Sequence, residues 1–312
     1  MDLSPDMQLW NGRVDTGEGD RARRWHQVVR PLDDGTLPGI ALLGFACDEG
    51  VARNQGRIGA AEGPAVLRRA LAGHAWHPTA PLADAGDVAC TDGDLAAAQQ
   101  RLAEAVQQLV TVGHFPLVLG GGHETAYGTY SGLARACPES VIGIVNFDAH
   151  FDLRAAAVPT SGTPFAQIAD DCAVRSQPFR YACLGVAEPS NTQALFDRAR
   201  ALDVRWRLDT EMVPWRLAET CSFLADFVAS VDRVYLTIDL DVLPAAQMPA
   251  VSAPAGFGVE LAVVETLVAD LAASGKLAAA DLVEFNPRFD QDSHGAKAAA
   301  RLAWCITRHL KR

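Results

Sequence analysis

The sequence predicts a three-layer α/β/α fold, in which a mostly parallel β-sheet is flanked by helices. Short apolar runs typical of buried strands alternate along the chain with longer periodic segments typical of helices. The composition agrees, because 49% of the 312 residues are hydrophobic and only 21% are charged, which favours one large buried core. Since the sequence shows neither a linker-like stretch nor a fixed-period repeat, we predict one domain over residues 1–312, with residues 1–37 as an N-terminal cap.

The strands of this sheet are predicted from apolar runs that end in glycine or in polar residues. In chain order they cover residues 39–46, 117–119, 141–152, 180–186, 204–208, 234–241 and 280–287. Helices are predicted at about 62–72, 95–112, 124–136, a short segment after 164, 192–202, 214–230, 259–274 and 296–310. Pro64 near the start of the first helix fits, because proline is favoured in a first turn. Residues 48–59 are predicted to form a long loop.

Composition and charge exclude several function classes. The net charge of −11 argues against a nucleic-acid surface, which is usually basic. The N-terminus lacks the basic and apolar segments of a signal peptide, and no run of about 18 apolar residues predicts a membrane span. Seven scattered cysteines without a CxxC pair indicate reduced thiols. We therefore expect a cytoplasmic protein with a small-molecule substrate, and a homo-oligomer that uses Ala/Leu-rich helix faces such as residues 261–271.

The polar ends of three predicted strands carry the chemistry. Asp148, His150 and Asp152 follow the run Val141–Val145 and are spaced by two, so they project to the same side of an extended chain. In the same way Asp239 and Asp241 follow the strand at 234–238, and His123 follows the strand at 117–119 through a glycine turn. Ligands of open α/β sheets bind outside the carboxyl ends of the strands, where these side chains would meet.

Six such ligands suit two metal ions bridged by carboxylates rather than one zinc ion. Oxygen and imidazole donors without thiolate favour Mn²⁺ ahead of Zn²⁺ or Fe²⁺. The charges balance, because four carboxylates offset two divalent ions. The alternative is that each acid merely caps a helix or turn at a strand end, but three such motifs together argue against it.

With these motifs in view, the chain resembles the ureohydrolase (arginase–agmatinase) superfamily of binuclear manganese enzymes, and within it most closely the formimidoylglutamase branch. The resemblance covers residues 10 to about 292 and rests on the stretches GGGHE, NFDAHFD, TIDLDVLP and EFNP, with WNGRVD, RNQGR, DLR, TSGTPF, PSNT and VSAP. It implies an arginase-like fold and two Mn²⁺ per subunit bound by His123, Asp148, His150, Asp152, Asp239 and Asp241, with Asp148 and Asp239 bridging.

The resemblance also implies a reaction from histidine degradation, the hydrolysis of N-formimidoyl-L-glutamate to L-glutamate and formamide. A metal-bridging hydroxide would attack the amidine carbon, and the leaving amine must then be protonated. Asp152 is the nearest proton carrier, and Glu284 is placed to pair with the cationic amidinium. Arginases carry a histidine in the loop after DxHxD that relays protons, but residues 161–168 of this chain contain none, so turnover would depend on water or on Asp152.

The substrate carries two carboxylates, and arginine is the side chain best suited to hold them. We therefore expect Arg53, Arg57 and Arg154 to bind the substrate, with Asn54 and Asn191 as polar helpers. Three alternatives stay open. These are another ureohydrolase such as a guanidinobutyrase or agmatinase, a non-catalytic homologue, and a different binuclear hydrolase such as a phosphatase. Arginines would repel a cationic guanidine, intact ligands argue against a non-catalytic protein, and no glycine-rich phosphate loop is evident.

Overall fold

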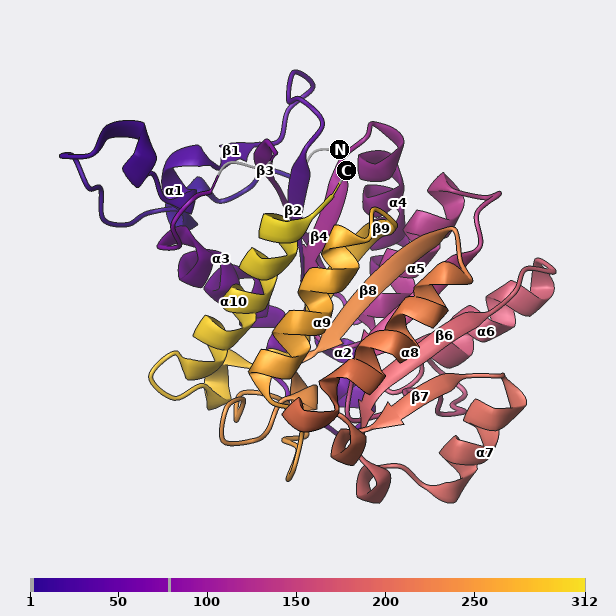
Figure 1. Cartoon of the computed structure of the whole chain (residues 1–312). Helices are drawn as coiled ribbons and strands as arrows, with labels where there is room; N and C mark the ends of the chain where they lie inside the picture. The colour runs from indigo at the N-terminus through magenta and orange to yellow at the C-terminus, as the bar shows by residue number, and fades with distance from the viewer. Residues whose placement is uncertain (1–2, 78–79, 312) are drawn as a thin grey trace.

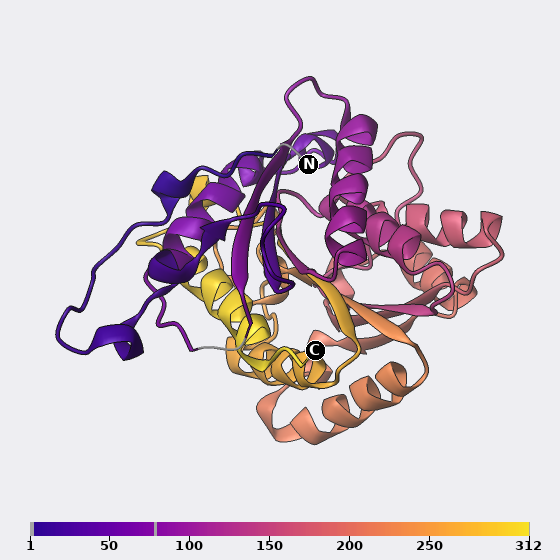
Figure 2. The same cartoon turned by 90° about the horizontal axis from the view of Figure 1, so that it is seen from above.

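Nine parallel strands form one sheet in the computed structural model, which describes residues 3–77 and 80–311. The strand order is β1-β3-β2-β4-β9-β8-β5-β6-β7. The bounds are β1 (Arg30–Pro31), β2 (Ile40–Ala46), β3 (Leu82–Ala89), β4 (Phe115–Leu119), β5 (Ile142–Phe147), β6 (Arg180–Val186), β7 (Arg205–Leu208), β8 (Arg233–Asp239) and β9 (Leu277–Val283). Helices lie on both sides of the sheet (Figures 1 and 2), so the predicted three-layer fold is confirmed.

Two helical layers enclose the sheet. Helices α3, α8, α9 and α10 pack in a row over one face, and α4, α5 and α6 pack together over the other (Figure 2). The helix bounds are α1 (Trp25–Val28), α2 (Glu49–Arg53), α3 (Gly63–Ala72), α4 (Leu95–Thr111), α5 (Thr125–Ala136), α6 (Pro164–Val174), α7 (Gln193–Ala201), α8 (Leu217–Ala229), α9 (Leu261–Ala273) and α10 (His294–His309). Within the described part of the chain, no helix combines the length and apolarity that a membrane crossing requires.

Strand β3 was not predicted from the sequence, because acidic residues interrupt the apolar run that would indicate a buried strand. Asp84 is fully buried, and its carboxylate accepts hydrogen bonds from Arg68 Nε at 2.8 Å and Arg68 Nη2 at 2.9 Å. Arg68 also donates to Asp87, and Trp10 Nε1 donates to Asp84 at 2.7 Å. The charges that would exclude these residues from a sheet are thus paired, as buried charges must be.

The N-terminal segment packs on the same edge of the sheet. Its strand β1 pairs with β3, and the Trp10 and Trp25 rings stack with centroids 6.4 Å apart in the main hydrophobic core. Residues 1 and 2 of the predicted cap lie outside the described part. The single-domain assignment and the extent of the cap stay predictions.

The four central strands position the polar residues of interest. In space β4, β9, β8 and β5 are consecutive neighbours, although they are far apart in sequence. Strand β5 is buried along its whole length, as its sequence IGIVNF predicts for a central parallel strand. Because all four strands run in the same direction, their carboxyl ends lie together at one edge of the sheet.

Candidate metal centre

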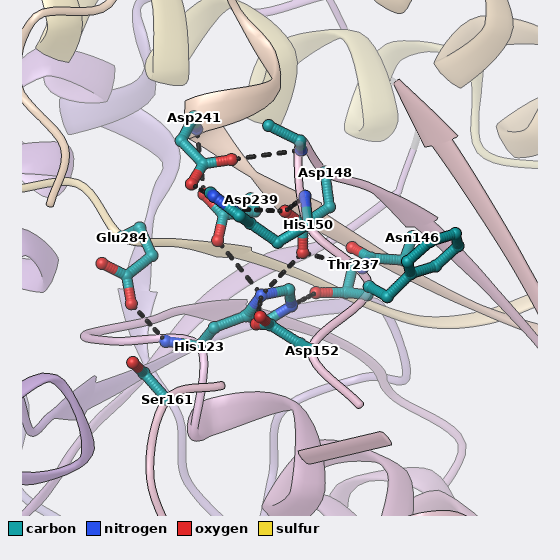
Figure 3. Close-up of polar contacts among 12 residues, drawn as sticks. His123, Asn146, Asp148, His150, Asp152, Ser161, Thr237, Asp239, Asp241 and Glu284 are labelled. Atoms are coloured by element: carbon teal, nitrogen blue, oxygen red, sulfur yellow. Dashed lines mark hydrogen bonds and ion pairs between the residues drawn. The ribbon is translucent and has the colours of Figure 1, made fainter. Parts of the chain in front are cut away.

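The six predicted ligands come together at the carboxyl ends of β4, β5 and β8 (Figure 3). Their donor atoms form two groups, each with all atoms within 4.8 Å of one another. The first group contains His123, Asp148, Asp152 and Asp239, and the second contains Asp148, His150 and Asp241. Asp148 belongs to both groups, which suits its predicted bridging role between two ions. Asp239 belongs only to the first group, so its bridging role stays a prediction.

Backbone amides hold these carboxylates in place. The His150 N–H donates to Asp148 Oδ1 at 2.6 Å, and the Asp241 N–H donates to Asp239 Oδ1 at 2.9 Å. The second oxygen of each carboxylate, Asp148 Oδ2 and Asp239 Oδ2, faces His123 Nδ1 at 3.2 Å and 3.1 Å. One oxygen is therefore fixed by the turn at the strand end, and the other points to the centre.

His123 has the orientation expected of a metal ligand. Its Nδ1 lies 2.9 Å from Asp152 Oδ2, in addition to its contacts with Asp148 and Asp239. This nitrogen is buried, yet it makes no hydrogen bond of good geometry among the described residues. The opposite nitrogen, Nε2, lies 3.1 Å from Thr237 Oγ1. An unpartnered buried nitrogen that faces three carboxylates fits a cation between them.

The shifted pKa values of the cluster also indicate that a positive charge would stabilise it. Burial raises the pKa of Asp239 well above its usual value, and the neighbouring carboxylates of Asp241 and Asp148 raise it further. The pKa values of Asp152 and Asp241 are raised as well, chiefly by burial. Burial opposes the charged form of His123 too, but the facing carboxylates outweigh it and raise its pKa well above the usual value. Divalent ions at the two groups would remove this repulsion and would displace the protons.

Two cavity residues adopt backbone conformations that L-residues rarely take. The φ angle is +47° at Asp152 and +66° at Glu284, and strain of this kind is frequent at functional sites. Glu284 Oε1 accepts the His123 N–H at 2.8 Å, whereas its buried Oε2 has no hydrogen-bond partner in the described chain. Burial, followed by repulsion from the Glu124 carboxyl, raises the pKa of Glu284 to about 8. A cation in the cavity would favour its ionised form.

A cavity of about 280 Å³ opens onto the donor groups. Among the predicted residues it is lined by Asn54, His150, Asp152, Arg154, Asp239, Asp241 and Glu284. It is also lined by Gln55, Gly56, Ser161, Ser252 and Ala253, which were not assigned from the sequence. The stretches RNQGR, TSGTPF and VSAP contain all five, so the motifs were found but the residues within them that face the cavity were not.

The three predicted arginines have different environments. Arg154 lines the cavity, and no hydrogen bond or ion pair of its guanidinium is found within the described chain. The Arg53 guanidinium instead donates to Glu49 and to the carbonyls of Pro159 and Gly93. The Arg57 guanidinium donates to the carbonyls of Ser252, Pro249 and Val251 and lies 4.0 Å above the Phe289 ring. Neither of the last two lines the cavity, and both connect loops around it.

The two asparagines also differ. Asn54 lines the cavity and donates to Ser161 Oγ at 3.2 Å. Asn191 is buried behind the cluster, and its amide is occupied by backbone groups. It donates to Ala149 O and Ala187 O, both at 2.9 Å, and accepts the Phe151 N–H at 3.1 Å. The structure thus places Asn191 where it supports the loop that carries His150, and away from the cavity.

A comparison with family models matches the arginase family over residues 38–308. The chain belongs to the arginase family. Enzymes of this family depend on a binuclear metal centre, and the two donor groups of this chain offer the residues for one. The predicted relationship to the ureohydrolase superfamily is thus confirmed.

Relatives that are similar in sequence over nearly the whole chain are named formimidoylglutamase. The chain is 68% identical to the formimidoylglutamase of Chromobacterium violaceum over 307 residues, which are 98% of this chain and 99% of that protein. It is 58% identical to the formimidoylglutamase of Aeromonas hydrophila, over 95% of this chain and 96% of that protein. These relatives confirm the predicted branch.

Solved structures of the family share the fold. The formimidoylglutamase of Bacillus subtilis matches with a TM-score of 0.83 at 22% identity, over 96% of this chain and 94% of that one. The formiminoglutamase of Trypanosoma cruzi, determined with Mn²⁺, matches with a TM-score of 0.78 at 25% identity, over 86% and 92% of the two chains. The arginase-like architecture predicted from the motifs is therefore confirmed.

Proposed function

We propose that this protein hydrolyses N-formimidoyl-L-glutamate to L-glutamate and formamide at a centre of two Mn²⁺ ions. The observation that carries this proposal is the convergence of six donors in two groups that share Asp148. Relatives named formimidoylglutamase, at up to 68% identity among those compared, support the substrate. The donor set contains only carboxylates and imidazoles, which suits Mn²⁺, and the Trypanosoma cruzi relative was determined with this ion.

When bound, the two ions would activate a water molecule for attack on the amidine carbon, since coordination lowers the pKa of water. Asp152 lies at the cavity wall, where it can carry a proton to the departing amine of glutamate. The unpartnered Oε2 of Glu284 is placed to pair with the cationic amidinium. Residues 161–168 contain no histidine that could relay protons. We therefore propose Asp152 as the proton carrier.

Recognition of the glutamate part would fall to other residues that line the same cavity. Arg154 is exposed, lines the cavity and has no competing ion pair in the described chain, so it is the arginine best placed to bind a substrate carboxylate. Its stem packs over Gly162, where an added Cβ would lie 2.8 Å from Arg154 Cδ. Asn54 and Ser161, which contact each other, can donate further hydrogen bonds. Arg53, Arg57 and Asn191 would then act by holding the surrounding loops.

Replacing Arg154 tests this assignment. Arg154→Gln should raise KM for N-formimidoyl-L-glutamate by roughly 10- to 150-fold, because a hydrogen bond to a charged group contributes roughly 1.5–3 kcal/mol. The value of kcat should change much less, and so should the metal content. Arg135→Gln, on the α5 surface away from the cavity, is the matched control. Steady-state kinetics give the answer, and an unchanged KM in Arg154→Gln would refute the assignment.

We further expect a cytoplasmic homo-oligomer. All seven cysteines are free, in keeping with reduced thiols. The predicted subunit face at residues 261–271 is wrong, because the valines and leucines of α9 pack in the protein's own core.

A further inference from the structure

A layer of polar side chains lies beneath the metal donors and is not explained by ligation or substrate binding. Asn146, on β5, is fully buried, and its Nδ2 donates to Asp148 Oδ2 at 2.9 Å (Figure 3). The same nitrogen donates to the Tyr181 hydroxyl oxygen at 2.9 Å. Tyr181 is on β6, the neighbour of β5, and its hydroxyl donates to Phe151 O at 3.0 Å.

The direction of these hydrogen bonds is fixed by chemistry. Both N–H groups of the Asn146 amide are used, one on the Asp148 carboxylate and one on the phenol. Its carbonyl oxygen, Oδ1, is buried without a partner among the described residues. A flipped amide would place this oxygen against the Asp148 carboxylate, where the two would repel each other. The position therefore keeps a donor facing Asp148 even though an acceptor is left unsatisfied, which is a costly arrangement in a buried site.

The same layer controls the backbone between the ligands. Cys183, directly opposite Asn146 in the β5–β6 register, donates its Sγ–H to His150 O at 3.2 Å. Tyr181 holds the next carbonyl, that of Phe151, which directly precedes Asp152. The Tyr181 ring is itself fixed, because it stacks on Phe165 with centroids 4.4 Å apart. Side chains of β5 and β6 thus hold both the shared carboxylate and the chain that carries His150 and Asp152.

We propose that Asn146, held by Tyr181, is a positioning residue that fixes the orientation of the carboxylate shared by the two metal groups. This inference rests on the proposed metal centre. Groups that hydrogen-bond to metal ligands from outside set the orientation and donor strength of those ligands, and their loss costs about 10- to 100-fold in metal affinity or activity. Misorienting Asp148 should weaken metal binding more than misorienting any other donor, because Asp148 belongs to both groups.

The test is Mn²⁺ affinity, measured by titration calorimetry on metal-free protein. Asn146→Leu removes both donors at similar volume and should weaken binding of Mn²⁺ by about 10- to 100-fold. Tyr181→Phe keeps the stacked ring and the Asn146 donor on Asp148. It should therefore weaken Mn²⁺ binding as well, but by less than Asn146→Leu does. Thr220→Val is the control, because it also changes a fully buried polar side chain, but on α8, away from the donors.

Thermal unfolding of the metal-free variants separates positioning from a merely structural role. A positioning role predicts weaker Mn²⁺ binding in Asn146→Leu than in Thr220→Val at comparable Tm. Unchanged affinity, with only a lower Tm, would overturn it. If Asn146→Leu does not fold, Tyr181→Phe decides, and an affinity equal to that of Thr220→Val would overturn the inference. Failure of the unmodified protein to bind two ions would instead overturn the metal centre itself, and the inference with it.

Discussion

Asp148→Ala is expected to abolish hydrolysis and to remove both metal ions. Asp148 is fully buried and is the donor common to the two groups, so its removal leaves both groups one donor short. The loss should exceed the roughly 10- to 100-fold effect of residues that only support a ligand. Metal content by mass spectrometry and the rate of glutamate release measure the two effects.

The matched control for this change is Asp197→Ala. Asp197 is an exposed carboxylate on α7 whose contacts are Arg200 and Gln193. It should keep two metal ions and full activity. If Asp148→Ala, shown to be folded by circular dichroism, retained two ions per subunit, the shared-carboxylate arrangement would be wrong.

Glu284→Gln is expected to lower kcat/KM by roughly 30- to 5,000-fold while it leaves the metal content unchanged. The amide keeps an oxygen that can accept the His123 N–H, but it removes the charge proposed to pair with the amidinium. Loss of one partner from a buried charged pair costs about 2–5 kcal/mol, which corresponds to this range. Steady-state kinetics together with metal analysis provide the measurement.

Glu219→Gln, at an exposed ion pair with Arg216 on the surface, serves as the control and should behave as the unmodified protein. Two results would contradict the proposed role of Glu284. One is normal kcat/KM in Glu284→Gln, and the other is loss of metal, which would make Glu284 part of the metal centre.

The metal donors could be predicted from the sequence because they depend on local geometry and one topological rule. Residues spaced by two after a strand point the same way, and the carboxyl ends of parallel strands share an edge. His123, Asp148 and Asp239 follow three different strands, and the structure places the Asp148 and Asp239 carboxylates 3.2 Å and 3.1 Å from His123 Nδ1. Strand β3 could not be predicted in this way, since its buried Asp84 is compatible with a strand only because Arg68 pairs with it.

The partners of long polar side chains could not be predicted either. Arg57 reaches carbonyls at positions 249–252, nearly two hundred residues away, and Asn191 reaches back to Ala149. Nothing in the local sequence distinguishes these residues from Arg154, which lines the cavity. Arginine and asparagine occur both among side chains that line a cavity and among side chains that hold loops. Only the tertiary contacts show which role a given residue has.

Product formation shows whether this protein is a metal-dependent hydrolase of one amidine substrate. Metal-stripped and Mn²⁺-loaded protein would be given N-formimidoyl-L-glutamate, agmatine, arginine and 4-guanidinobutyrate in parallel. We predict release of glutamate and formamide from the first substrate alone, and only with Mn²⁺ present. Turnover of a guanidine in its place would keep the metal centre but contradict the carboxylate recognition by Arg154, and turnover by metal-stripped protein would contradict the account as a whole.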